Sequence, residues 1–277
     1  MDKEYTRETL LTTVAELQSK LGAPDLCIID VRPAEDFARG HIPGATHFDL
    51  FGLSLIDTSE APLKAFMFMI HHVFELRGVS ENKQVIFYEN NSGMRAARGL
   101  WFLEFFGHAN VKMLDGGFQA WKTANAPITT AVTAPQAAAF KIAERREVLA
   151  SADDVLRSLN KKDVAILDTR SKGEYLGTQV RAARGGAIPG SIHIEWTDNI
   201  APDGKFKSND ELKAMYDKAG ITRDQEVVSY CQGGYRAAHS YVALRLLGFP
   251  KVRNYIGSWK EWGDRADLPI ETPQGPK

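Results

Sequence analysis

One cysteine begins a short loop whose other residues favour sulfur chemistry. The loop reads Cys231-Gln232-Gly233-Gly234-Tyr235-Arg236. It follows the β-type run 226–230 and precedes residues 237–244, which have helical composition, so the thiol is expected on a strand-to-helix turn. Such a turn aims backbone N–H groups at one point, and the helix adds partial positive charge. Both effects favour the thiolate, which is the reactive form of cysteine.

The remaining loop residues are expected to bind an anionic substrate beside the thiolate. Gly233 and Gly234 free the backbone N–H groups to converge. Arg236 adds a permanent charge whose forked donors suit oxyanions. Gln232 and Tyr235 complete this substrate-binding loop, and Tyr235 either shapes the pocket mouth or packs between domains. No histidine or carboxylate base is required, because sulfur transfer needs a thiolate and not the abstraction of a substrate proton.

Two plainer interpretations stand beside this one. Cys231 is alternatively a buried, inert cysteine at the end of a core strand, which is where free cysteines are often found. Arg236 is alternatively a helix-start arginine that only pairs with a surface carboxylate. The rest of the chain has to decide between these readings.

The bulk composition is globular and carries no strong charge. The 277 residues are 44% hydrophobic and 25% charged, enough for one large or two ordinary domains. With 34 basic and 35 acidic residues the net charge is -1, which gives no overall field toward nucleic acid or membranes. Residues 1–8 are charged and lack an apolar signal core, and no apolar run is long enough to span a bilayer. We therefore expect a cytoplasmic protein with small-molecule partners, no nucleic-acid partner and no membrane contact.

Cysteine usage excludes two further kinds of site. Cys27 and Cys231 are the only two cysteines of the sequence, and they form neither a disulfide framework nor a metal-ligand spacing. Cys27 lies in the apolar stretch 26–31, where a core position is expected. The sequence thus predicts no metal and no cofactor.

The chain contains an internal repeat. Asp30-Val31-Arg32 recurs as Asp168-Thr169-Arg170, and a later block matches at a constant offset of 141, including Trp121 with Trp262. Each copy runs strand, Pro-Gly turn, helix, strand, loop, helix, Gly turn, strand. This order predicts two tandem α/β domains, each a mainly parallel sheet flanked by helices. In the second copy the expected strands are 164–167 and 227–230, and the expected helices are 209–219 and 237–247.

The two copies differ at the cysteine. Glu89 stands opposite Cys231, and the segment 89–95 is one residue longer than the cysteine loop. A carboxylate cannot accept sulfur as a thiolate does, so one copy looks active and the other structural. We therefore expect an inactive N-terminal domain over residues 1–130, a linker over 131–146 and a catalytic domain over 147–277. A cysteine kept only for packing would more plausibly face an apolar residue in the other copy.

Together these motifs resemble those of the rhodanese family, specifically its two-domain sulfurtransferases. The matching features are the Asp-x-Arg strand ends, the Ile-Pro-Gly turns, the endings 117–121 and 257–262, and the six-residue cysteine loop of the second copy. The resemblance implies a silent first domain and a persulfide that forms on Cys231. The glutamine after the cysteine looks most like the bacterial thiosulfate sulfurtransferases of this family.

The expected activity is the transfer of sulfane sulfur from thiosulfate to cyanide or another thiophilic acceptor. Thiosulfate is a dianion, so an electropositive loop with Arg236 suits it, and 3-mercaptopyruvate is the alternative donor. Animal enzymes of both kinds carry an arginine where this chain has Glu174, which leaves the donor open. A protein sulfur acceptor is also compatible with the loop.

Two other classes of function use similar features. Cysteine-loop phosphatases and arsenate reductases place five residues between cysteine and arginine, whereas four separate Cys231 from Arg236 here. The shorter loop favours sulfur over phosphate. A non-catalytic binding module is the remaining alternative, and the complete cysteine loop argues against it.

Overall fold

The computed structural model describes residues 5–274 and divides the chain into two compact units. The first unit comprises Met1–Leu53, Met67–Arg145 and Ile200–Phe206, and the second comprises Ser54–Phe66, Arg146–Asn199 and Lys207–Lys277. Two segments belong to the unit of the other half of the chain: 54–66 to the second unit and 200–206 to the first. The sequence repeat does not predict either assignment. Within residues 5–274, no helix combines the length and the apolar character needed to cross a membrane.

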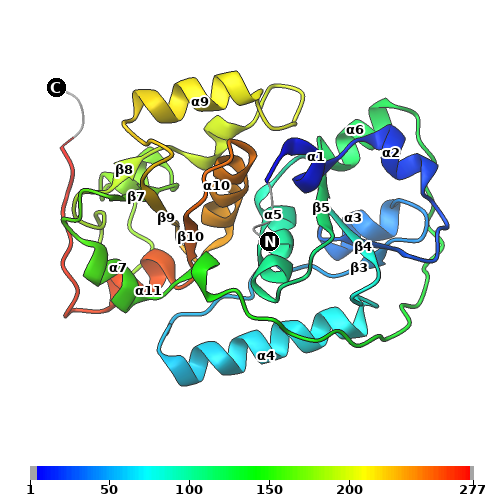
Figure 1. Cartoon of the computed structure of the whole chain (residues 1–277), viewed down its shortest axis with the longest axis horizontal. Helices are drawn as coiled ribbons and strands as arrows, with labels where there is room; N and C mark the ends of the chain where they lie inside the picture. The colour runs from blue at the N-terminus through cyan, green and yellow to red at the C-terminus, as the bar shows by residue number, and fades with distance from the viewer. Residues whose placement is uncertain (1–4, 275–277) are drawn as a thin grey trace. The chain divides into compact units, whose positions relative to one another are not determined.

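The N-terminal half supplies a parallel sheet of order β1-β5-β4-β2-β3. Figure 1 labels its strands β3, β4 and β5. Its strands are β1 (Leu11–Thr12), β2 (Leu26–Asp30), β3 (Thr46–His47), β4 (Gln84–Tyr88) and β5 (Val111–Leu114). Its helices are α1 (Arg7–Leu10), α2 (Val14–Ser19), α3 (Ala34–Arg39), α4 (Glu60–Leu76), α5 (Met94–Phe105) and α6 (Gly117–Thr123). Apolar runs such as β2 suit strands that are covered on both faces.

The C-terminal half repeats this topology with the order β6-β10-β9-β7-β8. Its strands are β6 (Leu149–Ala150), β7 (Val164–Asp168), β8 (Ile192–His193), β9 (Glu226–Tyr230) and β10 (Val252–Tyr255). Its helices are α7 (Ala152–Ser158), α8 (Lys172–Tyr175), α9 (Asn209–Lys218), α10 (Tyr235–Leu246) and α11 (Ser258–Asp264), with 3-10 turns η1 (Arg146–Val148) and η2 (Trp196–Asn199). The predicted fold class is confirmed, and the predicted strands and helices are met to within two residues at their ends.

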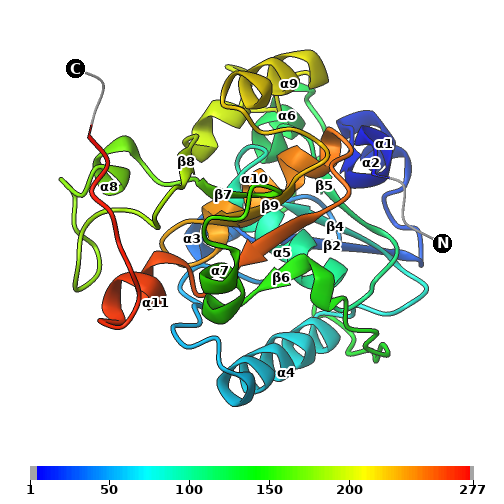
Figure 2. The same ribbon diagram turned by 60° about the vertical axis from the view of Figure 1, so that its left-hand side comes forward.

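Alternate residues of β9 face different helices of the second unit. Val228 and Tyr230 belong to an apolar cluster with Val155 of α7 and Trp259 of α11. The hydroxyl of Ser229 points to the other face, where it donates to the carbonyl of Ala237 in α10 at 3.1 Å. Figure 2 shows α7 and α11 side by side. Helices therefore cover both faces of this sheet, as its apolar strands require.

The predicted linker has no helix or strand in residues 131–145, but it is packed against the first unit. The side chain of Phe140 is buried against His71, and the N–H of Ala143 donates to the carbonyl of Phe106 at 3.0 Å.

Cys27 is buried in β2, where burial raises the pKa of its thiol to about 11. Cys27 is thus a core residue, as expected.

Candidate functional site

Cys231 occupies the turn between β9 and α10, as the sequence predicts. The strand ends at Tyr230, and the helix begins at Tyr235, two residues earlier than expected. Tyr235 and Arg236 therefore lie in the first helical turn, and Tyr235 is buried. Cys231 is a free cysteine whose side chain is 1% exposed. This placement brings the sulfur atom to the start of a twelve-residue helix.

Two groups hold the cysteine from within the second unit. The N–H of Gly234 donates to Sγ of Cys231 at 3.1 Å. The Ser258 hydroxyl accepts the N–H of Cys231 at 3.0 Å, lies 4.0 Å from Sγ and donates to the carbonyl of Tyr255 at 2.7 Å. The backbone donor at the sulfur favours its anionic form, whereas the Ser258 hydroxyl gives its proton to Tyr255 and fixes the cysteine backbone.

The loop backbone is held by α11 and by its own turn geometry. The N–H groups of Trp259 and Lys260 donate to the carbonyls of Cys231 and Gln232 at 2.8 and 3.0 Å. Gly234 has a φ of +82°, a left-handed conformation that favours glycine. A side chain at Gly233 would begin 3.0 Å from the Ser54 hydroxyl. Each glycine is thus explained, one by its backbone conformation and the other by a close neighbour.

Gln232 binds the neighbouring loop rather than the sulfur. Its Nε2 atom donates to the backbone carbonyl of Arg181 at 2.8 Å. Arg181 itself lies 3.5 Å from a carboxylate oxygen of Glu174, with a half-exposed side chain. The sequence did not single out Arg181.

Arg236 pairs with a buried carboxylate, which neither prediction for this arginine anticipated. Its Nη1 and Nη2 atoms donate to the two carboxylate oxygens of Glu174 at 2.5 and 2.9 Å. The side chains of Arg236 and Glu174 are 13% and 3% exposed, so this is not a surface pair. Glu174 comes from α8, where it also caps the helix by accepting the N–H of Ser171 at 3.1 Å.

The pair determines the charges beside the sulfur. Burial alone would raise the pKa of Glu174, but the hydrogen bonds and charge of Arg236 hold it at about 2. Burial would lower the pKa of Arg236, but its bond to Glu174 and the nearby sulfur of Cys231 raise it above its usual value. Both groups are therefore charged at neutral pH, and Arg236 faces both a carboxylate and the cysteine.

The Asp-x-Arg motifs form buried ion pairs at the strand ends. In the second unit Arg170 pairs with Asp168 at 2.6 Å, and the Tyr230 hydroxyl donates to the same carboxylate at 2.5 Å. Arg32 pairs with Asp30 at 2.6 Å in the first unit. Since both copies contain this ion pair, it does not distinguish a reactive copy.

Glu89 fills the corresponding loop of the first unit with its own carboxylate. The N–H of Phe118 donates to the Glu89 carbonyl at 2.7 Å, as that of Trp259 does to Cys231. One oxygen of the Glu89 carboxylate accepts the N–H groups of Arg95 and Ala96 at 2.6 and 3.1 Å. Despite these bonds, burial raises the pKa of Glu89 to about 7. The backbone donors at this helix start are therefore already occupied.

The repeat held signals for two groups that the sequence interpretation missed. Ser258 corresponds to Gly117 at the offset of 141, and both have a left-handed backbone, with φ of +53° and +57°. A serine in this conformation is uncommon, which indicates a role for its side chain. Asn254, whose amide donates to the carbonyl of Gly234 at 3.1 Å, corresponds in the same way to Met113. Comparing the copies position by position would have found both.

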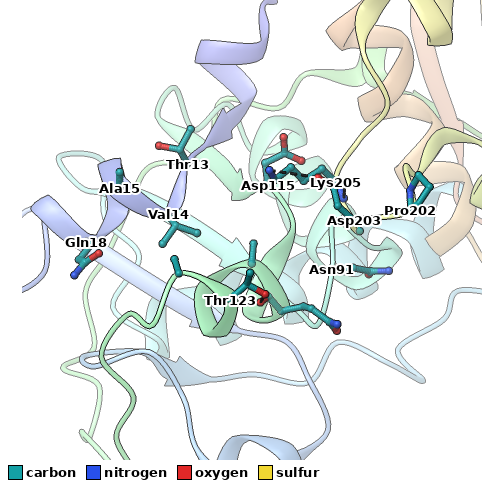
Figure 3. Close-up of a pocket in the computed structure, with 14 residues that line it drawn as sticks. Thr13, Val14, Ala15, Gln18, Asn91, Asp115, Thr123, Pro202, Asp203 and Lys205 are labelled. Carbon is teal, nitrogen blue, oxygen red and sulfur yellow. Dashed lines mark hydrogen bonds and ion pairs between the residues drawn. The ribbon is translucent and has the colours of Figure 1, made fainter.

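A cavity lies elsewhere, in the first unit (Figure 3). It measures about 850 Å³ and is lined by residues that include Thr13, Gln18, Asn91, Asp115 and Lys205, with none from the cysteine loop. Because no residue of the cysteine loop lines this cavity, we do not assign the reaction to it. Among residues 5–274, no group of three or more His, Cys, Asp or Glu side chains is arranged to hold a metal ion.

Comparison with known proteins gives one family and two kinds of relative. The model of the rhodanese-like domain matches residues 13–124 and 151–265. A thiosulfate sulfurtransferase of Azotobacter vinelandii is 34% identical over 268 residues, covering 97% of this chain and 99% of the relative. The sulfur carrier protein TtuD of Thermus thermophilus is 34% identical over 284 residues, covering 96% and 98%.

Solved structures show the same fold at lower identity. The anaerobic ergothioneine biosynthesis enzyme from Chlorobium limicola, solved with trimethyl histidine, superposes with a TM-score of 0.84 at 23% identity. The match covers 99% of this chain and 72% of that one. At this identity the likeness establishes the fold and nothing about the substrate.

Proposed function

Because the chain belongs to the rhodanese-like family, we propose that it is a thiosulfate sulfurtransferase that works through a persulfide on Cys231. One observation supports this proposal most directly. The second unit holds a buried free thiol at a helix start, with the N–H of Gly234 at 3.1 Å from the sulfur, where the first unit holds the carboxylate of Glu89. Relatives named thiosulfate sulfurtransferase, similar over nearly the whole chain, support thiosulfate over 3-mercaptopyruvate.

The first half-reaction transfers sulfur to the enzyme. The Cys231 thiolate attacks the outer sulfur of thiosulfate and forms a new S–S bond, while the bond to the inner sulfur breaks and its electron pair leaves with sulfite. The N–H of Gly234 and the charge of Arg236 offset the negative charge that gathers at the sulfur. No proton has to move in this step, which is consistent with a loop that has no built-in base.

The second half-reaction regenerates the thiolate of Cys231. A thiophilic acceptor such as cyanide attacks the outer sulfur of the persulfide, and the electron pair of the S–S bond returns to Cys231. The N–H of Gly234 that bound the first thiolate also stabilises this leaving thiolate. The relative named as a sulfur carrier supports a protein thiol as a further acceptor. Gln232, Gly233, Gly234, Tyr235 and Arg236 form the substrate-binding loop of this proposal.

The proposal assigns different roles to the two copies and a compartment to the enzyme. We assign catalysis to residues 147–277 and inactivity to residues 1–130, since Glu89 occupies the backbone donors of the first loop. The cytoplasm is the proposed location, because reducing conditions keep a catalytic thiol free, and both cysteines are free here.

The test compares the wild-type protein with Cys231→Ser. Thiocyanate formation from thiosulfate and cyanide is expected to fall to background in the variant, because serine cannot form a persulfide. Intact mass after thiosulfate alone should show one added sulfur atom on the wild type and none on the variant.

A Cys27→Ser protein provides the matched control, since Cys27 is buried with a raised pKa and should leave the reaction unchanged. Faster turnover of 3-mercaptopyruvate than of thiosulfate would reassign the donor. Hydrolysis of an aryl phosphate without sulfur uptake would overturn the proposal in favour of a phosphatase, and the absence of any turnover or sulfur uptake would favour a binding module.

A further inference from the structure

Asn254 forms a hydrogen bond to the carbonyl of Gly234, the glycine whose N–H donates to the sulfur of Cys231. Its side chain is fully buried on β10, and Nδ2 donates to the carbonyl of Gly234 at 3.1 Å. Asn254 is in register with Ser229 of β9, two residues before Cys231. The amide thus reaches the cysteine loop from the neighbouring strand, on the sheet face that α10 covers.

Both polar groups of Gly234 are therefore used. Its N–H donates to Sγ of Cys231 at 3.1 Å, and its carbonyl accepts from Asn254 and from the N–H of Ala238 in the first turn of α10. Glycine has wide backbone freedom, and here it adopts a φ of +82°. A bond to the carbonyl restricts the rotations about this Cα atom, and so fixes the direction in which the N–H points.

The first copy shows that the sheet does not need an amide at this position. Met113 pairs with Phe87 in the first sheet as Asn254 pairs with Ser229 in the second. Moreover, Oδ1 of Asn254 has no hydrogen-bond partner among the residues that the structure describes. A buried unpaired acceptor is unfavourable, so the asparagine carries a cost in stability. Such a cost is expected at functional sites.

We propose that Asn254 is a positioning residue for sulfur transfer, which acts through Gly234 to aim a backbone N–H at the sulfur of Cys231. The inference rests on the proposed function, because it assigns the reactive thiol to Cys231. It adds a residue outside the cysteine loop to the machinery that stabilises the thiolate and the leaving thiolate. The position also differs between the two copies, as the cysteine itself does.

The first test is Asn254→Met, which installs the side chain of the other copy. Thiosulfate-dependent kcat/KM is expected to fall about threefold to tenfold, the range expected for loss of one ordinary hydrogen bond. The midpoint of thermal unfolding should stay the same or rise, because the unpaired Oδ1 is removed with the amide. Asn254→Leu serves as a second apolar variant should methionine pack poorly, and Met113→Leu is the matched control in the first copy.

The second test measures the ionisation of Cys231. The rate of alkylation of Cys231 by iodoacetamide is measured against pH by peptide mass, and its midpoint should move to higher pH in both Asn254 variants. Arg236 faces Cys231 from α10 and Glu174 faces Arg236 from α8, and both are unchanged in every variant. Activity within twofold of wild type and an unmoved midpoint would overturn the inference, as would an activity loss that only follows a loss of stability.

The two proposals fail in different ways. If wild-type protein takes up no sulfur from thiosulfate, the proposed function is wrong, but the alkylation profile still tests whether Asn254 tunes Cys231. If wild type transfers sulfur and the alkylation profile does not respond to Asn254, only the positioning role is wrong.

Discussion

The charge of Arg236 is shared between a carboxylate and the cysteine. Glu174 binds it through both oxygens, at 2.5 and 2.9 Å, and Arg181 lies 3.5 Å from the same carboxylate. Two arginines and one glutamate leave one net positive charge near the loop. If Arg236 binds the donor as we propose, a dianionic donor competes with Glu174 for it. This competition makes Glu174 the residue whose removal should most change the affinity for thiosulfate.

Glu174→Gln is expected to lower the KM for thiosulfate and to destabilise the fold. Glutamine still suits the capping box of α8, so only the charge is lost. KM should fall roughly threefold to tenfold, the equivalent of about 1 kcal/mol, because Arg236 is no longer neutralised. Leaving a buried arginine without its partner should cost about 3 kcal/mol of unfolding free energy. Steady-state kinetics and urea unfolding measure the two effects.

Asp36→Asn is the matched control for that experiment. Asp36 corresponds to Glu174 in the first copy and pairs with Arg39 at 3.1 Å, but the arginine is 77% exposed. The control should change stability by less than about 1 kcal/mol and should leave KM unaffected. An unchanged KM in Glu174→Gln would show that Arg236 does not contact the donor.

At the scale of elements, α11 organises the cysteine turn. Its first residue, Ser258, receives the N–H of Cys231, and the next two N–H groups bind the loop carbonyls. Further along, the buried carboxylate of Glu261 accepts the N–H and hydroxyl of Thr58 at 2.8 and 2.9 Å, and the hydroxyl of Tyr255 at 2.8 Å. One short helix therefore anchors both the cysteine loop and the segment 54–66 in the second unit.

The turn into α10 ends at Gly234, whose N–H donates to Sγ of Cys231. Gly234→Ala places a side chain at a φ of +82°, and Gly220→Ala does so at +79°, at a position with no atom within 4 Å of the added carbon. Each should lose about 1 kcal/mol of stability from backbone strain. Only Gly234→Ala should also lose about tenfold or more in kcat/KM, because the N–H at the sulfur shifts. Equal kinetics for the two variants would contradict a role for this N–H group.

Across the whole molecule, two buried carboxylates respond to pH in opposite directions. Glu174 has a pKa lowered to about 2, so its stabilisation is present above its usual value of 4.5 and is lost as pH falls through 2. Glu89 has a pKa raised to about 7 from 4.5. Its folded state binds the proton more tightly, so its contribution is greatest below pH 4.5 and is lost as pH rises through 7.

Glu89→Gln should therefore flatten the decline of stability between pH 5 and pH 8. The amide oxygen can still accept the N–H groups of Arg95 and Ala96, but it does not titrate. The difference in unfolding free energy between wild type and variant should change by an amount on the order of 3 kcal/mol over this pH range. Urea unfolding at several pH values measures it, and thiosulfate turnover at each pH should match wild type. If the difference in unfolding free energy between the two proteins did not change with pH, Glu89 would not titrate near neutrality.

The two-copy fold and the location of the thiol followed from local sequence signals. Strand and helix periodicity, the Asp-x-Arg repeats and the offset of 141 are properties of neighbouring residues, and parallel sheets with helical crossovers leave few topologies. The turn at Cys231 was predictable for the same reason, because a β-type run, two glycines and a helical run are contiguous. The difference between Glu89 and Cys231 also needed only an alignment of the chain with itself.

The groups that surround the sulfur meet through contacts between distant parts of the chain. Arg236 and Glu174 are 62 residues apart, and they meet because β7 and β9 are neighbours whose carboxyl ends lie at one edge of the sheet. Asn254 reaches Gly234 across 20 residues through the register of β10 with β9. No local pattern encodes such pairs, since they depend on register and packing. The sequence alone thus determined the nucleophile expected for this protein, and the fold determined the partners that set its charge and direction.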